Sequence, residues 1–195
     1  NPDLKPEKSL NYEAGSSFKA DGVFGSDDHL FAKAVFFYDD VKDFIAPKAW
    51  LEPTTPPTLY YSSQNVGHVV RKGIELSGTY AAGQFSTSVS YGLLHAVDKE
   101  TNERMNGITP QSANLKLAYA FPAQAINVWY RAHWSKGGES SVEDRATGKK
   151  LHFSSFLTHS LGAEWSPKVA DLANLQAGIA VVNPVSYTHL RAHET

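Results

Sequence analysis

The ten residues Ser112–Phe121, which read SANLKLAYAF, decide the fold of this chain. Every second residue is apolar or aromatic, and the residues between them are serine, asparagine, lysine or alanine. The side chains of a β-strand point alternately to its two faces, so this stretch predicts a strand with one apolar face and one polar or small face. The apolar face carries Ala113, Leu115, Leu117, Tyr119 and Phe121.

The same alternation recurs along the chain in about eight segments separated by turn signals. Each segment continues for roughly 10 to 16 residues, whereas strands of globular proteins usually have about 5 to 6 residues. A strand that crosses a membrane needs about 9 to 11 residues. We therefore predict an all-β fold of antiparallel transmembrane strands in meander order, formed by residues 10–20, 30–45, 60–80, 85–97, 112–121, 126–134, 151–165 and 175–183.

The connections alternate in length, as they do in outer-membrane barrels with short turns on one side and long loops on the other. Residues 82–84 and 122–124 form the short turns, and residues 47–57, 98–107 and 136–150 form the long or polar loops. The Pro-rich stretch 47–57 cannot be a central strand. Aromatic residues near segment ends suit the girdles at the membrane surfaces. A soluble β-sandwich or lipocalin-like barrel remains open, because its strands alternate too.

The composition of the chain argues against several classes of function. The chain has 195 residues, with 18 Lys and Arg against 20 Asp and Glu and with no cysteine. A balanced charge does not favour nucleic-acid binding, and the lack of cysteine excludes disulfides and thiolate chemistry. Gly-rich phosphate loops and hydrolase or metalloprotease motifs are absent, so we expect neither an enzyme, nor a bound metal, nor a cofactor. The acid pairs Asp27-Asp28 and Asp39-Asp40 are expected to be solvated.

Four groups of residues resemble the sequence blocks of TonB-dependent outer-membrane receptors. The first is Asn1–Ser9 followed by Tyr12–Gly15, similar to the family's Asn-Pro-x-Leu-x-Pro-Glu block. The second is Phe37-Tyr38 with Val41–Ile45. The remaining two follow in the family's order and lie on predicted strands: Asn65–Gly67 with Lys72–Leu76 and Tyr80, and Ile108–Pro110 with Ser112–Leu115.

The resemblance covers residues 1–183 and implies one part of a barrel of about 22 strands with a plugged lumen. It implies an outer-membrane protein of a Gram-negative bacterium that takes up an iron-siderophore, haem or a similar large nutrient. The implied partners are outer-membrane lipid, the nutrient and the TonB complex, which would act through a plug domain outside this chain. A receptor specific for haem or haemoglobin is one alternative, and a passive porin-like barrel is another.

The last residues break the alternation. Residues 184–195 form a separate tail, and Val185–Thr195 resembles the in-frame translation of a transposase mosaic-end sequencing adapter. We expect this tail to be non-native, with a native polar C-terminus as the alternative.

Two groups of side chains are candidate ligand contacts. Haem iron would bind an imidazole, and the haem propionates would pair with arginine. Aromatic rings can stack on an aromatic or catecholate ligand. The first group is expected on the lumen face near the outer end and contains Trp129, Arg131, His133 and His152; the second lies in or beside an extracellular loop and contains Trp50, Tyr60 and Tyr61.

Overall fold

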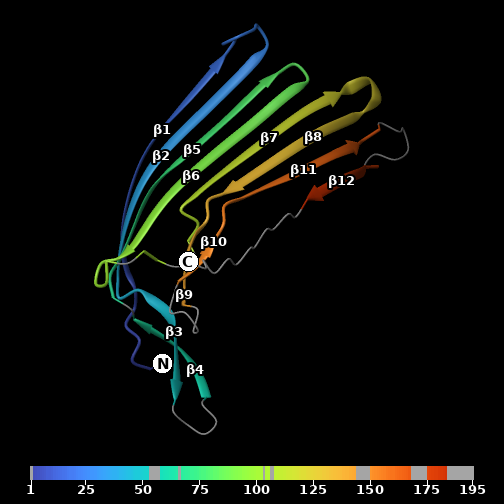
Figure 1. Cartoon of the computed structure of the whole chain (residues 1–195). Coiled ribbons are helices and arrows are strands. Elements are labelled where there is room, and N and C mark those ends of the chain that lie inside the picture. Colours follow the sequence, from blue (N-terminus) through green and yellow to red (C-terminus); the bar gives the residue numbers. More distant parts are fainter. Residues whose placement is uncertain are drawn as a thin grey trace, which may run out of the picture. The chain divides into compact units, whose positions relative to one another are not determined.

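The computed structural model describes residues 2–52, 58–65, 67–102, 104–105, 108–143, 150–167 and 175–183. Its main element is an eight-stranded sheet with the strand order β1-β2-β5-β6-β7-β8-β11-β12 (Figure 1). The strands are β1 (Lys8–Asp21), β2 (Asp28–Lys42), β5 (Val69–Ala82), β6 (Phe85–Asp98), β7 (Gln111–Phe121), β8 (Ile126–Ser135), β11 (Phe156–Trp165) and β12 (Ala177–Asn183). The prediction of an all-β fold with eight long strands in meander order is confirmed.

The register of β7 confirms which residues share a face. β7 pairs antiparallel with β6 and with β8, and Leu115 lies between Val89 and Ala132. The next residue, Lys116, lies between Ser88 and Arg131. Directly paired residues of antiparallel strands share a face. The polar row and the apolar row of the sequence therefore continue across neighbouring strands as two different faces of the sheet.

The apolar face is largely uncovered by the described part of the chain. Val89 is 51% exposed, Leu161 is 54% exposed and Ile179 is 75% exposed. A single-layered sheet with an exposed apolar face is stable only where something apolar covers that face. The polar face is where serine, asparagine and charged side chains gather. No helix in the described residues is long and apolar enough to cross a membrane.

Two short hairpins lie outside the main sheet and correct the predicted loops. β3 (Ile45–Glu52) pairs with β4 (Thr58–Asn65), so the loop expected at 47–57 is largely a β-ribbon. Pro47 lies within β3, paired with Ser63, and a two-stranded ribbon tolerates it because each strand has one free edge. β9 (Gly138–Glu143), within the loop expected at 136–150, pairs with β10 (Lys150–Phe153) to form the other hairpin.

These hairpins also correct three predicted segment boundaries. The strand expected at 30–45 ends at Lys42, and the one expected at 60–80 is two strands, β4 and β5. The strand expected at 151–165 is divided between β10 and β11. Alternation alone missed these breaks because a ribbon alternates as a long strand does. The two predicted short turns are confirmed: Gly83 adopts a φ of +54° between β5 and β6, and Pro122–Gln124 forms a single 3-10 turn.

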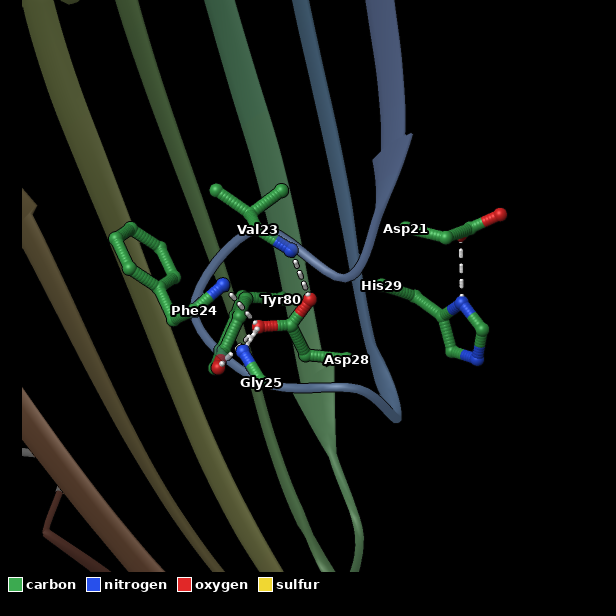
Figure 2. A network of polar contacts seen from close by, with 7 residues as sticks. All are labelled: Asp21, Val23, Phe24, Gly25, Asp28, His29 and Tyr80. Atoms are coloured by element: carbon green, nitrogen blue, oxygen red, sulfur yellow. Dashed lines mark hydrogen bonds and ion pairs between the residues drawn. The ribbon is translucent and has the colours of Figure 1, made fainter.

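Asp28 organises the turn between β1 and β2 (Figure 2). Its Oδ1 accepts a hydrogen bond from the N–H of Val23 at 2.7 Å, and its Oδ2 accepts bonds from the N–H groups of Phe24 (2.7 Å) and Gly25 (2.9 Å). The hydroxyl of Tyr80 donates a further bond to Oδ2 at 3.1 Å. Asp28 is only 1% exposed, so the prediction of a solvated carboxylate is wrong here.

Two opposing effects act on the pKa of Asp28. Burial raises it, and the hydrogen bonds from Phe24, Val23, Tyr80 and Gly25 lower it by more, so the pKa lies below its ordinary value. A carboxylate that accepts several backbone N–H bonds is stabilised in its charged form. The turn is therefore held by an ionised Asp28.

The chain divides into two compact units, each described by itself. The first unit contains residues Asn1–Ala14, Phe37–Gly73 and His95–Met105. Within it Asp39, which is 6% exposed, accepts a bond from the Ser9 hydroxyl at 2.7 Å and bonds from Nε and Nη2 of Arg71 to its Oδ2. Its neighbour Asp40 contacts Nε2 of His68 at 2.7 Å. The second acid pair is thus also engaged rather than solvated.

Asn65 links three segments of the first unit. Its Oδ1 accepts the N–H of Lys5 at 2.8 Å, and its Nδ2 donates to the carbonyl groups of Lys5 (2.9 Å) and Asp43 (2.6 Å). Nearby, Oε1 of Glu7 accepts the N–H of Ile45 at 2.6 Å. The described residues of the segment before β1 are therefore tied to the base of the β3–β4 hairpin.

Candidate functional site

Three of the predicted site residues lie together on the polar face of β8, in the second unit, which contains Gly15–Phe36, Ile74–Leu94 and Asn106–Thr195. Trp129, Arg131 and His133 are every second residue of the strand and so share a face. β8 lies between β7 and β11 (Figure 1). Arg131 is paired with Lys116 and Ser160, and His133 is paired with Asn114 and Thr158.

Direct contacts fix these side chains in place. The guanidinium carbon of Arg131 lies 4.5 Å from the centroid of the Trp129 ring, within the range of a cation–π interaction. The Nε1–H of Trp129 donates to Oε1 of Glu164 at 3.2 Å. A strand partner of Trp129 is Gly162, which leaves room for the indole ring. Arg131 is therefore stacked on an aromatic ring that is itself anchored on two sides.

His133 belongs to a chain of polar groups across three strands. Its Nδ1 lies 2.7 Å from Oδ1 of Asn114, and Nδ2 of Asn114 donates to Oγ of Ser90 at 3.1 Å. Because an amide oxygen only accepts, Nδ1 of His133 carries the proton in this arrangement. In that tautomer the lone pair of the ring lies on Nε2, the atom that could bind a metal.

Asn114, Arg131 and His133 line a hollow of about 430 Å³ over β5, β6, β7, β8 and β11. Its walls carry serine and threonine hydroxyls together with Asn114, Lys116, Arg131 and His133, and they also include the apolar residues Val89, Leu115 and Ala132. The described residues contain no group of three or more His, Cys, Asp or Glu that could hold a metal ion. The polar groups of the hollow offer hydrogen bonds and positive charge.

The other four predicted site residues lie in the hairpins. Trp50 and Tyr60 are direct register partners in the β3–β4 hairpin, and Tyr61 pairs with Ala49. His152 pairs with Glu139 in the β9–β10 hairpin. The structure therefore brings Trp50 together with Tyr60 along one ribbon and gathers Trp129, Arg131 and His133 on one strand. Whether any of these residues binds a ligand stays a prediction.

Sequence reasoning did not name Lys116 and Asn114 as site residues, although it placed both on the polar face. The missing information was the strand register, which sets Lys116 opposite Arg131 and Asn114 opposite His133. Register depends on turn length and on pairing across strands. The short turn at residues 122–124 was the sequence signal that could have given this register.

The comparison with protein families decides the identity. The family described as "TonB dependent receptor-like, beta-barrel" matches residues 1–183. This chain belongs to the TonB-dependent receptor β-barrel family. The family match ends at the last residue of β12. Residues 184–195 lie outside the described residues, so their assignment as a non-native tail stays a prediction.

Several curated proteins are similar to this member of the TonB-dependent receptor family. "Heme/hemopexin utilization protein C" of Haemophilus influenzae (strain 86-028NP) is 25% identical over 186 residues, covering 94% of this chain and 26% of that protein. "Vitamin B12 transporter BtuB" of Photobacterium profundum is 29% identical over 152 residues, covering 77% of this chain and 23% of that protein. The chain spans about a quarter of the length of these relatives.

Solved structures support the same fold. "Copper transporter OprC" has a TM-score of 0.71 at 18% identity, covering 92% of this chain and 26% of that chain. "The FrpB iron transporter from Neisseria meningitidis (F3-3 variant)" has a TM-score of 0.65 at 18% identity, covering 93% of this chain and 26% of that chain. Together with the single large sheet and the family match, these likenesses show the fold of part of such a barrel and contradict the β-sandwich alternative.

Proposed function

We propose that this chain forms part of the barrel of an outer-membrane receptor that takes up an iron-siderophore, haem or a similarly large nutrient. The observation that carries the proposal is the family match over residues 1–183. The names of relatives add a class of cargo: haem and hemopexin, vitamin B12 and hemin. All of these are organic molecules or complexes too large for a narrow pore, and the family match favours a receptor over the porin-like alternative.

The geometry fits a protein surrounded by lipid. The exposed apolar face of the sheet would contact outer-membrane lipid, and the polar face would line the lumen. In this arrangement Trp129, Arg131 and His133 are accessible from the lumen, and Trp50, Tyr60, Tyr61 and His152 belong to hairpins on the extracellular side. Energy would come from the TonB complex acting on a plug domain outside this chain.

Haem is not favoured over other cargo. The similar proteins include haem receptors, but the vitamin B12 transporter has the higher identity. The His133 imidazole would offer Nε2 to haem iron, and Arg131 would pair with a haem propionate. The stacking of Arg131 on Trp129 suits any acidic aromatic ligand equally well. These residues therefore define a ligand surface without defining the ligand.

Uptake assays test the proposal. The full-length gene is returned to a Gram-negative strain that lacks its own receptors, and growth is measured on haem, on a panel of ferric siderophores or on vitamin B12 as the limiting nutrient. We expect growth on one nutrient, lost when tonB is deleted. Growth that persists without tonB would identify a passive barrel and reject the receptor.

A second assay tests the haem contacts. The double variant His133→Ala with His152→Ala is compared with wild type for growth on haem, and Ser86→Ala on the polar face serves as control. Loss of growth in the double variant alone supports haem ligation. Undiminished growth excludes these two histidines as haem contacts while leaving the receptor function standing.

A further inference from the structure

Two positively charged side chains face each other on the polar face without an acidic partner. Lys116 of β7 and Arg131 of β8 are direct register partners. The Cβ atoms of such partners lie about 4.5 to 5.5 Å apart, and like charges in this position destabilise a sheet. Among the described residues, no ion pair involves Lys116 or Arg131. Both side chains are exposed, so an anion from outside the described residues can reach them.

The surroundings of the pair suit an anion. Both residues line the 430 Å³ hollow, and none of the residues that line it is acidic. The same row continues on either side as Ser88 and Ser160, whose hydroxyls can donate hydrogen bonds. The next register pair on the same face, two residues along each strand, is Asn114 with His133. The hollow thus combines two full positive charges with hydroxyl donors.

Arg131 is also preorganised. Its stacking on Trp129 restricts the long side chain before any ligand arrives, and Trp129 is in turn bonded to Glu164. Fixing a flexible side chain in advance lowers the entropy cost of binding. The guanidinium fork matches the two oxygens of a carboxylate, while the Lys116 ammonium adds a second charge.

We infer that Lys116 and Arg131 bind a carboxylate in the lumen. The inference rests on the proposed function, because a receptor lumen has two sources of this group. One source is an aspartate or glutamate from a part of the receptor outside this chain. The other is a carboxylate of the transported molecule. Both would neutralise the pair in the same way, and the experiment separates them.

The test uses the full-length receptor in detergent and a carbodiimide, which activates carboxylates and joins them to an amine without a spacer. Peptide mass spectrometry then reads the product at Lys116. Coupling of Lys116 to an Asp or Glu of the receptor itself supports the protein source. Coupling of added citrate at Lys116 well above its coupling at the exposed Lys33 of the same face, with no protein cross-link, supports the ligand source. Citrate coupling no greater at Lys116 than at Lys33, with no protein cross-link, overturns the inference.

Matched variants sharpen the result. Arg131→Gln removes one charge from the pair, and we expect coupling at Lys116 to fall or citrate binding to weaken by roughly tenfold. Lys33→Gln removes a charge from another part of the same face and should leave both unchanged. Equal yields at Lys116 in wild type and Arg131→Gln would show that the two residues do not share an anion, which also overturns the inference.

The outcome is separable from that of the proposed function, because coupling is measured without uptake. A receptor that imports a nutrient while Lys116 stays unmodified rejects the carboxylate site alone. A cross-linked Lys116 in a protein whose uptake is independent of TonB rejects the receptor function alone.

Discussion

The indole ring of Trp129 occupies the space that a β-carbon at position 162 would need. A Cβ built on Gly162 would lie 2.6 Å from Cε2 of Trp129 and closer still to Cζ2, and 3.0 Å from the carbonyl oxygen of Ile179. Trp129 and Gly162 are register partners on β8 and β11. The glycine is therefore required by a neighbouring side chain, not by a special backbone conformation, and Trp129 is the ring on which Arg131 stacks.

Gly162→Ala should displace Trp129 and destabilise the barrel. Overpacking of this kind costs about 1 to 3 kcal/mol. The measurement is the unfolding free energy of the full-length receptor in detergent, with Gly178→Ala as control because a Cβ there meets only ordinary contacts at 3.5 Å or more. In a Trp129→Ala background the cost of Gly162→Ala should largely disappear. A cost that persists in that background would show that the strand backbone, not the ring, limits position 162.

Val89→Arg should be far more costly than Ser86→Arg. The two residues lie on opposite faces of β6, and Val89 is 51% exposed on the apolar face. Arginine near the bilayer midplane of a barrel costs about 2 to 4 kcal/mol, whereas a lumen position tolerates it. Assembly in the outer membrane and resistance to unfolding in lipid vesicles report the difference. Equal tolerance of both variants would contradict the assignment of the apolar face to lipid.

Asp28→Asn should weaken the turn between β1 and β2 in a pH-dependent way. The folded-state pKa of Asp28 is lowered, so its contribution is fully present above its ordinary value of about 4 and is lost as pH falls through the folded-state pKa. Melting temperatures of wild type and variant should differ at pH 7 and converge below about pH 4.

The exposed neighbour Asp27 provides the control for this experiment. Asp27→Asn should melt with wild type across the whole pH range, since its side chain holds no backbone group of the turn among the described contacts. A constant gap between wild type and Asp28→Asn from pH 7 to pH 3 would show that the charge of Asp28 does not hold the turn.

Arg71→Ala should destabilise the first unit because, among the described contacts, it leaves the buried Asp39 with the Ser9 hydroxyl as its remaining donor. Arg71 is partly exposed, so we expect a loss of roughly 1 to 2 kcal/mol rather than the full cost of a buried pair. A double-mutant cycle with Asp39→Ala isolates the pair, and a coupling free energy near zero would contradict it. Ser9→Ala should cost less, since a neutral donor makes the weaker bond.

The fold was predictable because each strand repeats the same two-residue period over many residues. Ser112–Phe121 gives β7 almost to the residue, and Gly83 marks the turn between β5 and β6 because it supplies a positive φ. The hairpins β3–β4 and β9–β10 were missed because a ribbon and a long strand have the same period, so the pattern does not show where one ends.

The site was only half predictable. The alternation of side chains between the two faces of a strand placed Trp129, Arg131 and His133 on one face, as the structure has them. It could not foresee Lys116 opposite Arg131, which depends on register. It also treated Asp28 and Asp39 as solvated, because an acid pair at a turn gives no sign that backbone N–H groups or an arginine far along the chain will surround it.

Asn65 has a consequence for the order in which the chain assembles. Its amide bonds to Lys5 join residues 60 apart in sequence, and a contact of that range forms only after the intervening loop has closed. The residues between include β2 and the β3–β4 hairpin, whose base supplies Asp43. The segment ahead of β1 therefore cannot take up this position until Asn65 is available, however early it is synthesised.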